Sequence, residues 1–382
     1  MIDLSTFAPA EKKGPPKRVQ NVTLGNVLVV GSGVFGAWSA LKLLRSGYKV
    51  ELVDLWGPGN SRSSSGGESR LIRSFYGENR TYFEMASNSW DQWLQLEQDQ
   101  SIKILHHTGV LWMMPSEEEA LFSKMVNLME DYQHPFDVIS PEDMIELFPL
   151  INNGDGYALI EKKAGFLEAR KATNAVVTQF VKEGGIFKCG EVTLENNYVI
   201  LNGGKVIAEA YLFACGPWLK RLFPFLQLQI SRQEIYYFGL PEDVYPAYKG
   251  LIPWVDMNKD GFFYGIPIHD RRGFKIANDV RGVEVDPTTI DRMPSESLVD
   301  KSRHFLANKF PFLKDAPVLE SRVCQYSNSE DGNFIFDQHP EHPAIWILGG
   351  GSGHGFKHGP EIGGIVSAAF QNGEIPSTFV LS

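Results

Sequence analysis

The stretch of sequence that decides the fold is Val27-Leu28-Val29-Val30-Gly31-Ser32-Gly33-Val34-Phe35-Gly36. Its first four residues form a continuous apolar run, which is typical of a strand buried inside a parallel sheet. The segment from Val34 to Arg45 carries apolar residues at helical spacing, and Gly47 suits the position just past a helix end. Val50 to Val53 is a second apolar run. The order strand, glycine-rich turn, helix and strand predicts a βαβ unit.

The glycine spacing in this turn fits the pattern GxGxxG of dinucleotide-binding proteins. Gly31 allows the tight turn, Gly33 lets the backbone approach a pyrophosphate, and Gly36 lets helix and strand pack closely. The N-terminus of the following helix attracts phosphates. Asp54 ends the second strand, where a carboxylate can accept hydrogen bonds from ribose hydroxyls. The alternative is an ordinary turn between strand and helix. The motif by itself does not choose between NAD and FAD.

The rest of the chain alternates between helical and strand-like patterns. Helices are expected at 82–97, 117–133, 141–148 and 173–184, and strands at 110–113, 211–214, 234–238, 261–265, 273–277 and 344–348. A C-terminal helix follows the last strand. We therefore predict an α/β protein of two domains. A Rossmann-like nucleotide-binding domain comprises 26–98, 160–228 and 330–382. A substrate domain on a mixed, largely antiparallel sheet comprises 99–159 and 229–329, and residues 1–25 are expected to form a flexible arm.

Composition limits the classes of function. The chain has 382 residues and a formal net charge of −10, so its surface is poorly suited to bind nucleic acid nonspecifically. Its cysteines, Cys189, Cys215 and Cys324, are too far apart for a CxxC metal site, and a reducing compartment is expected. No apolar run approaches the ~20 residues of a membrane-spanning helix. Residues 1–26 lack the apolar region of a secretory signal. We expect a cytoplasmic protein that binds no metal and no membrane.

Two arginines follow a serine-rich segment shortly after the βαβ unit. Arg70 and Arg73 are three residues apart, which would place both guanidinium groups on one face if the segment were helical. One interpretation is that they bind an anion such as a carboxylate. The alternative is a surface ion pair with Glu68 or Glu78. The residues alone leave the two alternatives open.

Three further positions are candidates for chemistry. Lys357 follows a glycine-rich segment at 349–355 whose backbone N–H groups can hold an anion, although a solvated lysine on a flexible loop is the alternative. Lys275 lies between apolar neighbours and is either buried or extends to solvent. A lone cysteine such as Cys324 is usually a small core residue.

Taken together and in this order, these segments resemble the monomeric sarcosine oxidase family of amine-oxidising flavoproteins, which includes N-methyltryptophan and pipecolate oxidases. The resemblance runs from about Val27 to the C-terminal helix. Its most specific matches are Gly66-Gly67-Glu68-Ser69-Arg70-Leu71-Ile72-Arg73, Tyr264-Gly265-Ile266-Pro267 with Lys275, Val323-Cys324-Gln325-Tyr326, Asp337-Gln338-His339-Pro340-Glu341-His342 and Ser352-Gly353-His354-Gly355-Phe356-Lys357. The resemblance favours FAD over NAD.

The resemblance implies how FAD is held. Cys324 matches the cysteine that carries FAD through a thioether to the flavin 8α-methyl group. Lys275 matches the lysine near flavin N5 that promotes reaction with O₂, and Arg70 matches an arginine close to the flavin face. The full set of expected cofactor residues is Gly31, Gly33, Val34, Phe35, Gly36, Asp54, Ser64, Ser65, Ser69, Arg70, Val192, Gly216, Cys324, Gly353, Gly355 and Lys357.

The resemblance also implies the substrate, a small amine or amino acid that carries a carboxylate. Arg73 and Lys357 match the pair that binds this carboxylate, and Tyr264 and Tyr326 match tyrosines that line the pocket. Together with Lys275 and Arg70, these tyrosines form the expected catalytic group. The reaction implied is hydride transfer from the C–N bond to the flavin, then reoxidation by O₂, giving an imine and H₂O₂, in a monomer. Two alternatives stay open: a dehydrogenase with another electron acceptor, and a flavin-binding protein without turnover.

The sequence departs from the family at three positions. Gly66 and Asp279 stand where family members often have histidine, and Val255 stands at a methionine position of the sarcosine pocket. The small residues are interpreted as leaving room for a substrate larger than sarcosine. Asp279 is expected either to attract a substrate cation or to pair with Arg281.

Overall fold

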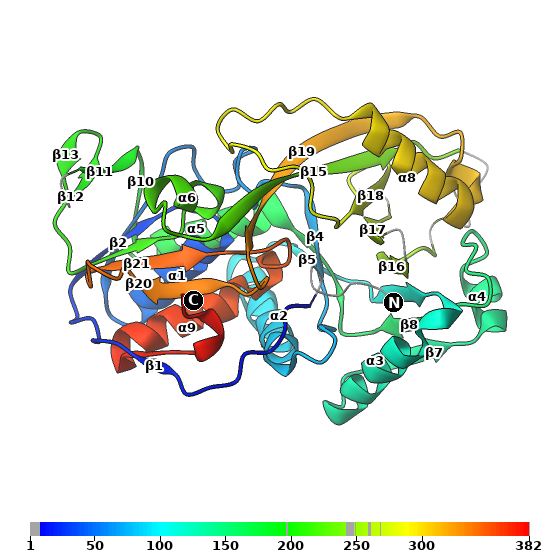
Figure 1. Cartoon of the computed structure of the whole chain (residues 1–382), viewed down its shortest axis with the longest axis horizontal. Helices are drawn as coiled ribbons and strands as arrows, with labels where there is room; N and C mark the ends of the chain where they lie inside the picture. The colour runs from blue at the N-terminus through cyan, green and yellow to red at the C-terminus, as the bar shows by residue number, and fades with distance from the viewer. Residues whose placement is uncertain are drawn as a thin grey trace.

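The computed structural model describes residues 8–195, 198–241, 248, 250–258, 261–267 and 269–381. Two large β-sheets lie side by side along the long axis of the molecule, and a small sheet lies between them in this view (Figure 1). Within the described part of the chain, no helix combines the length and apolar character needed to cross a bilayer.

The first large sheet contains the predicted βαβ unit. Its strand order is β10, β3, β2, β14, β21, β20, and all neighbours are parallel except β20 and β21. The strands are β2 (Asn26–Val30), β3 (Lys49–Asp54), β10 (Ile186–Cys189), β14 (Ala210–Phe213), β20 (Ile335–Gln338) and β21 (Ile345–Gly349). The central strands are apolar on both sides because both faces of the sheet are covered.

Helices cover one face of this sheet and smaller elements cover the other. The first face packs against α1 (Val34–Arg45), α2 (Arg80–Gln100), α5 (Ala169–Lys182) and α9 (Gly359–Asn372), which share one apolar core with the strands. The second face packs against η2 (Gly216–Trp218), α6 (Leu219–Leu222) and the ribbon formed by β11 (Val192–Glu195), β12 (Tyr198–Leu201) and β13 (Gly204–Lys205).

The second large sheet is mixed and largely antiparallel, as predicted. Its order is β19, β15, β18, β17, β16, β6, β8, β7, and only β16 and β6 are parallel neighbours. The strands are β6 (Val110–Met114), β7 (Phe136–Ile139), β8 (Tyr157–Glu161), β15 (Leu228–Phe238), β16 (Trp254–Asn258), β17 (Gly261–Ile266), β18 (Phe274–Asn278) and β19 (Val318–Ser329). The helices beside it are α3 (Glu119–Asp131), α4 (Pro141–Leu147) and α8 (Glu296–Lys309) (Figure 1).

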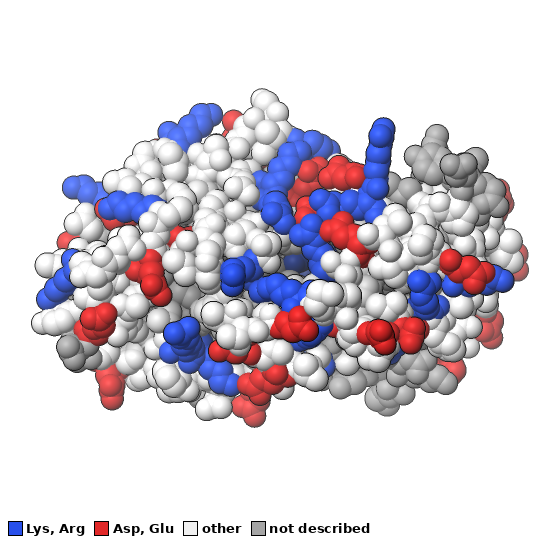
Figure 2. All heavy atoms as spheres, turned by 90° about the horizontal axis from the view of Figure 1, so that it is seen from above, with Lys and Arg blue, Asp and Glu red and all other residues white. Residues whose placement is uncertain are grey.

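Short elements connect the two halves. The small sheet has the order β4 (Ser69–Ile72), β9 (Gly165–Glu168), β5 (Leu105–His107), and a two-stranded pair joins β1 (Lys17–Arg18) to β22 (Glu374–Ile375). Single 3₁₀ turns are η1 (Ser116–Glu118), η4 (Pro311–Leu313), η5 (Phe356–His358) and η6 (Ser377–Phe379). On the face seen from above Figure 1, basic side chains gather near the middle with acidic side chains among them (Figure 2).

The predicted fold class is confirmed, with differences in detail. Helix α1 spans Val34–Arg45, as its periodicity predicts. Strand β19 and helix α8 were not predicted, and β19 pairs with β15 along nearly its whole length. The expected boundary at 160 falls inside β8 and therefore cuts a strand of the second sheet.

The expectation of a flexible N-terminal arm is wrong for residues 8–25, whereas residues 1–7 lie outside the described part. Strand β1 pairs with β22, and the Nζ of Lys17 lies 2.6 Å from the Oδ1 of Asp337, whose side chain is buried. The N–H of Val19 donates to the carbonyl of Gly373 at 2.9 Å. These partners are more than 300 residues away in the sequence, so local composition gave no sign of them.

Candidate functional site

The turn between β2 and α1 has the geometry that its glycines predict. Gly31 has a φ of +103°, in the region that favours glycine. A Cβ added to Gly36 would lie 1.9 Å from the carbonyl oxygen of Gly31, so any larger residue would force the turn apart. The N–H of Ser32 donates to the Oδ2 of Asp54 at 2.7 Å. The carboxylate at the end of β3 thus anchors the turn as well as facing the cavity beside it.

A cavity of about 380 Å³ begins at this turn. The predicted cofactor residues on its wall are Gly31, Gly33, Val34, Phe35, Asp54, Ser64, Ser65, Arg70, Val192, Gly216, Gly353 and Gly355, and Tyr326 also lines it. Four others, Gly36, Ser69, Cys324 and Lys357, are not part of this wall. The cavity therefore joins segments that are far apart in the sequence, as expected for a site assembled from dispersed segments.

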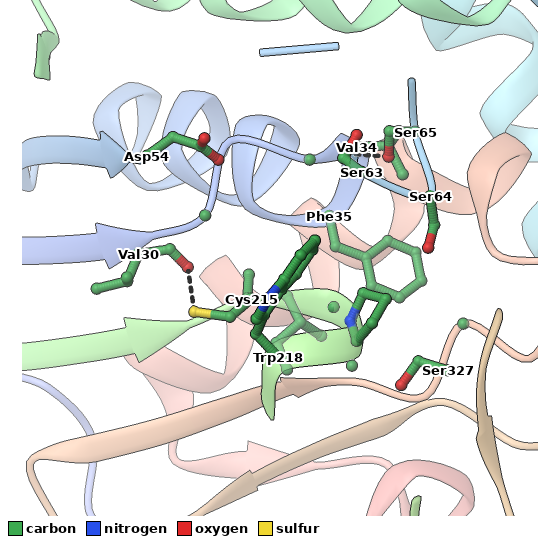
Figure 3. Close-up of a pocket in the computed structure, with 18 of the residues that line it drawn as sticks. Val30, Val34, Phe35, Asp54, Ser63, Ser64, Ser65, Cys215, Trp218 and Ser327 are labelled. Atoms are coloured by element: carbon green, nitrogen blue, oxygen red, sulfur yellow. Dashed lines mark hydrogen bonds between the residues drawn. The ribbon is translucent and has the colours of Figure 1, made fainter. Parts of the chain in front are cut away.

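Two hydrogen bonds fix opposite parts of the cavity wall (Figure 3). The N–H of Val34, at the start of α1, donates to the Oγ of Ser65 at 3.1 Å. The thiol of Cys215 donates to the carbonyl of Val30 at 3.4 Å, near the end of the cavity where Asp54 lies. Burial raises the pKa of Cys215, so this thiol is neutral at physiological pH.

Lys275 is buried beside Arg70. Its side chain is 1% exposed, which excludes the alternative that it extends to solvent. Its Nζ donates to the carbonyl of Ser69 at 2.8 Å and to the Oγ of Ser69 at 3.2 Å. Burial, and then the charge of Arg70, lower the pKa of Lys275 well below its usual value. The Arg70 guanidinium donates to the carbonyls of Ser69 and Ser64, both at 2.8 Å, and the partly exposed thiol of Cys324 interacts electrostatically with both cations.

A second pair of cations, Arg73 and Lys357, contacts the same side chain, Tyr76. Arg73 is 5% exposed and its guanidinium stacks 4.3 Å from the centre of the Tyr76 ring. Lys357 is 4% exposed and its Nζ donates to the Tyr76 hydroxyl at 2.6 Å and to the carbonyl of His354 at 3.1 Å. Burial, followed by the charge of Arg73, lowers the pKa of Lys357 well below its usual value. Two converging buried cations favour an anionic partner.

The hydroxyl of Tyr76 also joins two buried histidines. The Nε2 of His354 lies 3.0 Å from the carbonyl of Gly332, which can only accept, so this nitrogen carries the hydrogen. Burial lowers the pKa of His354, hence its Nδ1 accepts from the Tyr76 hydroxyl at 3.2 Å. The Nε2 of His358 then donates to the same oxygen at 2.8 Å. Tyr76 therefore holds Lys357 in one orientation, and the sequence pattern had not identified it.

The structure corrects the geometry expected for the two arginines. The segment is strand β4 and its end rather than a helix, so Arg70 and Arg73 do not share one face. Each instead accompanies a different lysine. The surface ion pairs considered for them involve other partners: Glu68 lies 3.1 Å from Arg322 and 3.3 Å from Arg170, and Glu78 lies 3.0 Å from Lys124.

Asp279 interacts with both the second cation pair and the tyrosines. The hydroxyl of Tyr326 donates to its Oδ1 at 2.9 Å, and Tyr326 also hydrogen-bonds Tyr264. Burial raises the pKa of Asp279 to about 7, against the opposing effects of Tyr326, Arg73, Lys357 and Arg281. Arg281 is therefore one of several groups that interact with Asp279.

The two small residues differ in what they contribute. A Cβ added to Gly66 would lie 1.8 Å from the carbonyl oxygen of Asn60, so glycine is required there by a tight turn. The turn is therefore sufficient to explain this glycine, and the interpretation that Gly66 makes room for substrate stays a prediction. Val255 is fully buried and stands directly opposite Tyr264 in the sheet. Because cross-strand partners share one face, Val255 contributes to the wall beside Tyr264.

One group of potential metal ligands occurs within the described residues. Side-chain atoms of His106, Glu168 and His269 lie within 4.8 Å of one another. Glu168 already receives a hydrogen bond from the Nε2 of His106 at 2.7 Å, and the Nζ of Lys171 lies 3.2 Å from its other oxygen. Both oxygens of this carboxylate are therefore already engaged, one by a hydrogen bond and the other by an ion pair. The expectation that the protein binds no metal stays a prediction.

Comparison with known proteins decides the family. A family model described as FAD dependent oxidoreductase matches residues 26–369. The chain belongs to this family. Among curated relatives of this FAD-dependent oxidoreductase, monomeric sarcosine oxidase of Bacillus sp. (strain B-0618) is 28% identical over 365 residues, covering 90% of this chain and 91% of the relative. Peroxisomal sarcosine oxidase of Homo sapiens is 29% identical over 364 residues, with the same coverage of 90% and 91%.

The chain is also similar to other relatives and, in its fold, to solved structures. N-methyl-L-tryptophan oxidase of Escherichia coli O139:H28 is 26% identical over 363 residues, covering 90% of this chain and 94% of the relative. The structure of L-proline dehydrogenase from P. horikoshii has a TM-score of 0.79 at 20% identity, covering 94% and 96% of the two chains. Fructosyl amine: oxygen oxidoreductase (Amadoriase I) from Aspergillus fumigatus has a TM-score of 0.74 at 20% identity, covering 93% and 88%. At such identities the solved structures establish the shared fold.

The residues present fit the cofactor of the family. One end of the cavity suits an adenosine diphosphate moiety. This end is formed by the tight glycine turn, the helix N-terminus at Val34 and the Asp54 carboxylate. The cavity continues past Ser64 to Arg70, one member of the first cation pair, and to Tyr326. Trp218 and Ser327 also line it, and the sequence gave no signal for either residue.

Proposed function

We propose that this FAD-dependent oxidoreductase is an oxidase of the C–N bond of a small amino acid or N-alkyl amino acid, with O₂ as electron acceptor and an imine and H₂O₂ as products. The names of the curated relatives, sarcosine oxidase and N-methyl-L-tryptophan oxidase, support this class of reaction. When bound, FAD supplies the hydride acceptor and the reaction with O₂. The chain supplies binding, orientation and charge.

The observation that carries the proposal is the pair of buried cations that both contact Tyr76. Arg73 and Lys357 are both buried and both contact Tyr76, and an α-carboxylate would contact both cations. Binding the carboxylate there would hold the α-carbon beside Tyr264 and Tyr326. This would restrict the orientation in which the substrate approaches the flavin. The pair therefore selects amino acids over plain amines.

The first cation pair is proposed to serve the cofactor. Arg70 lies on the cavity wall, and Lys275 is held by Ser69 in the layer behind it. A cation at this depth lowers the free energy of negative charge that develops when electrons pass to O₂. Cys324 is the proposed attachment point for a covalent flavin, supported by its position on β19 two residues before Tyr326, which lines the cavity.

We also propose the division into a cofactor domain of residues 26–98, 160–228 and 330–382 and a substrate domain of 99–159 and 229–329. The two sheets follow this division except at β8 and at Leu228, the first residue of β15, and thereby support it. A cytoplasmic location and a monomeric state complete the proposal.

The test is a screen of anaerobic flavin reduction over matched pairs, each an amino acid and the same molecule without its carboxylate. We expect N-methyl, cyclic or ordinary amino acids to bleach the flavin and their decarboxylated partners to do so poorly. Peroxide released on admitting air distinguishes an oxidase from a dehydrogenase. Decarboxylated amines that react as well as the amino acids would show a plain amine oxidase, and absence of bleaching by either set would refute the proposed activity.

A further inference from the structure

Asp279 occupies a fixed position at the border between the cation pair and the tyrosines. It follows β18, and its backbone N–H donates to the carbonyl of Phe262 at 2.8 Å. Its Oδ1 accepts from the Tyr326 hydroxyl at 2.9 Å, which fixes the rotation of the carboxyl group. Tyr326 lines the cofactor cavity and hydrogen-bonds Tyr264. The carboxyl group is thus oriented by the same side chains that border the expected substrate.

The groups that face Asp279 come from every element packed around it. Arg73 follows β4 and Lys357 belongs to η5, and both interact with Asp279 electrostatically, as does Arg281 from its own loop. The remaining titratable neighbours are the phenols of Tyr76, Tyr264 and Tyr326. Arg73, Lys357 and the Asp279 carboxyl group interact with one another and form the electrostatic complement of a zwitterion, whose carboxylate would contact the two cations and whose ammonium group would contact Asp279.

We propose that Asp279 is the proton acceptor for the substrate amine. The inference rests on the proposed function, because it assumes that the substrate carboxylate binds Arg73 and Lys357. In the step, one N–H bond of the substrate ammonium breaks and one O–H bond forms on the Asp279 carboxylate. The products are a neutral amine and a neutral carboxylic acid, so the net charge of the pocket and its contents is unchanged and no electrons are transferred.

The chemistry of C–N oxidation requires this proton transfer. A hydride leaves the α-carbon only when the nitrogen lone pair can form the C=N bond, and an ammonium group has no lone pair. An aliphatic ammonium group ordinarily keeps its proton up to about pH 10. Burial raises the pKa of Asp279 to about 7, which makes it a much better proton acceptor than a solvent-exposed carboxylate at neutral pH. Tyr326, Arg73 and Lys357 oppose this shift and keep part of the population ionised.

The first experiment compares the pH dependence of flavin reduction, with substrate saturating and O₂ absent, in the wild type and in Asp279→Asn. The amino acid is the best one found in the screen of matched pairs. In the wild type, the rate constant of reduction should rise through about pH 7, where Asp279 ionises. In Asp279→Asn the rise should move at least two pH units higher, toward the pKa of the substrate ammonium. The rate at pH 7 should therefore fall by about 100-fold or more and recover at high pH.

Two further variants separate proton transfer from positioning. Tyr326→Phe removes a hydrogen bond that lowers the pKa of Asp279, so the midpoint of the pH profile should move upward. Asp300→Asn, an exposed aspartate on α8, is the matched control and should leave the profile unchanged. If Asp279→Asn lowers the rate by the same factor at every pH, without moving the midpoint, Asp279 only positions the substrate and the proposal is overturned.

The second experiment measures binding and does not need turnover. Glycine and propionate have nearly the same shape and differ in having an ammonium or a methyl group. Titration of the oxidised holoenzyme with each, followed by flavin absorbance, gives the ratio of their Kd values. At pH 8, Asp279→Asn should bind propionate more tightly and glycine more weakly, so the ratio should change by at least tenfold. An unchanged ratio would overturn the proposal, whereas amino acids that fail to bleach the flavin, or bleach it no better than their decarboxylated partners, would refute the proposed function instead.

Discussion

Replacing Lys357 by methionine removes one of the two buried cations and leaves the other in place. The side chain is 4% exposed and its Nζ donates to Tyr76 and to the carbonyl of His354, so the charge is held where an anion between it and Arg73 would contact both. Methionine has a similar length and no charge. The change therefore tests the charge with little change in volume.

The size of the effect follows from burial and from the pKa of the amine. Two unit charges 4 Å apart interact by about 4 kcal/mol at an effective dielectric constant of about 20. Burial lowers the pKa of Lys357 well below its usual value, so protonating the amine offsets part of this energy when the carboxylate binds. We expect a net loss of ~2–3 kcal/mol, near the lower end of the range for removing one partner of a buried charge pair. This corresponds to a roughly 30- to 150-fold rise in Kd for an amino acid substrate.

The assay is anaerobic flavin reduction measured by rapid mixing at a series of substrate concentrations. Each amino acid is compared with its decarboxylated amine, because the amine has no group for Lys357 to contact. Lys357→Met should weaken the amino acid by the stated factor and leave the amine nearly unchanged, so the selectivity between them collapses. Lys182→Met, at an exposed lysine on α5, is the control. Equal weakening of acid and amine, or no weakening of either, would show that Lys357 does not bind the carboxylate.

Three further changes test other parts of the site. Cys324→Ser should release the flavin on acid precipitation and leave a colourless pellet, whereas wild type and Cys189→Ser, at an exposed cysteine, should keep a yellow one. Lys275→Met should slow reoxidation by about 100-fold or more, as for removal of an oxyanion-stabilising donor, and should change flavin reduction little. In the wild type, reoxidation measured by stopped-flow should also slow as pH rises through the pKa of Lys275, which burial holds below 10.5. Gly36→Ala should abolish retention of FAD because its Cβ would lie 1.9 Å from a carbonyl oxygen, whereas Gly364→Ala, where a Cβ meets nothing within 4 Å, should bind FAD normally.

The parts of the site that could be predicted from the sequence are those with a local geometric cause. The turn at Gly31 needs a positive φ and a close backbone contact, and both requirements are visible as glycines at fixed spacing. Strand β19 was not predicted because polar and charged residues interrupt it, and its stability comes from pairing with β15. Tyr76 was not identified because its partner Lys357 is 281 residues away, and no spacing pattern encodes such a contact.

The difference between the expected helix and the observed strand at Arg70 explains the organisation of the site. On a helix, residues three apart would have placed both arginines together. Because the segment is strand β4 and its end, Arg70 lies beside Lys275 and Arg73 lies near Lys357. In each pair, burial and then the charge of the arginine lower the pKa of the lysine. Two like-charged pairs are costly to bury without an anion. Under the proposed function the two pairs serve different negative charges: the substrate carboxylate at Lys357, and the charge that develops during electron transfer at Lys275. Because Arg70 lies on β4 and Arg73 directly follows it, we expect a shift of β4 to change substrate binding and reoxidation together.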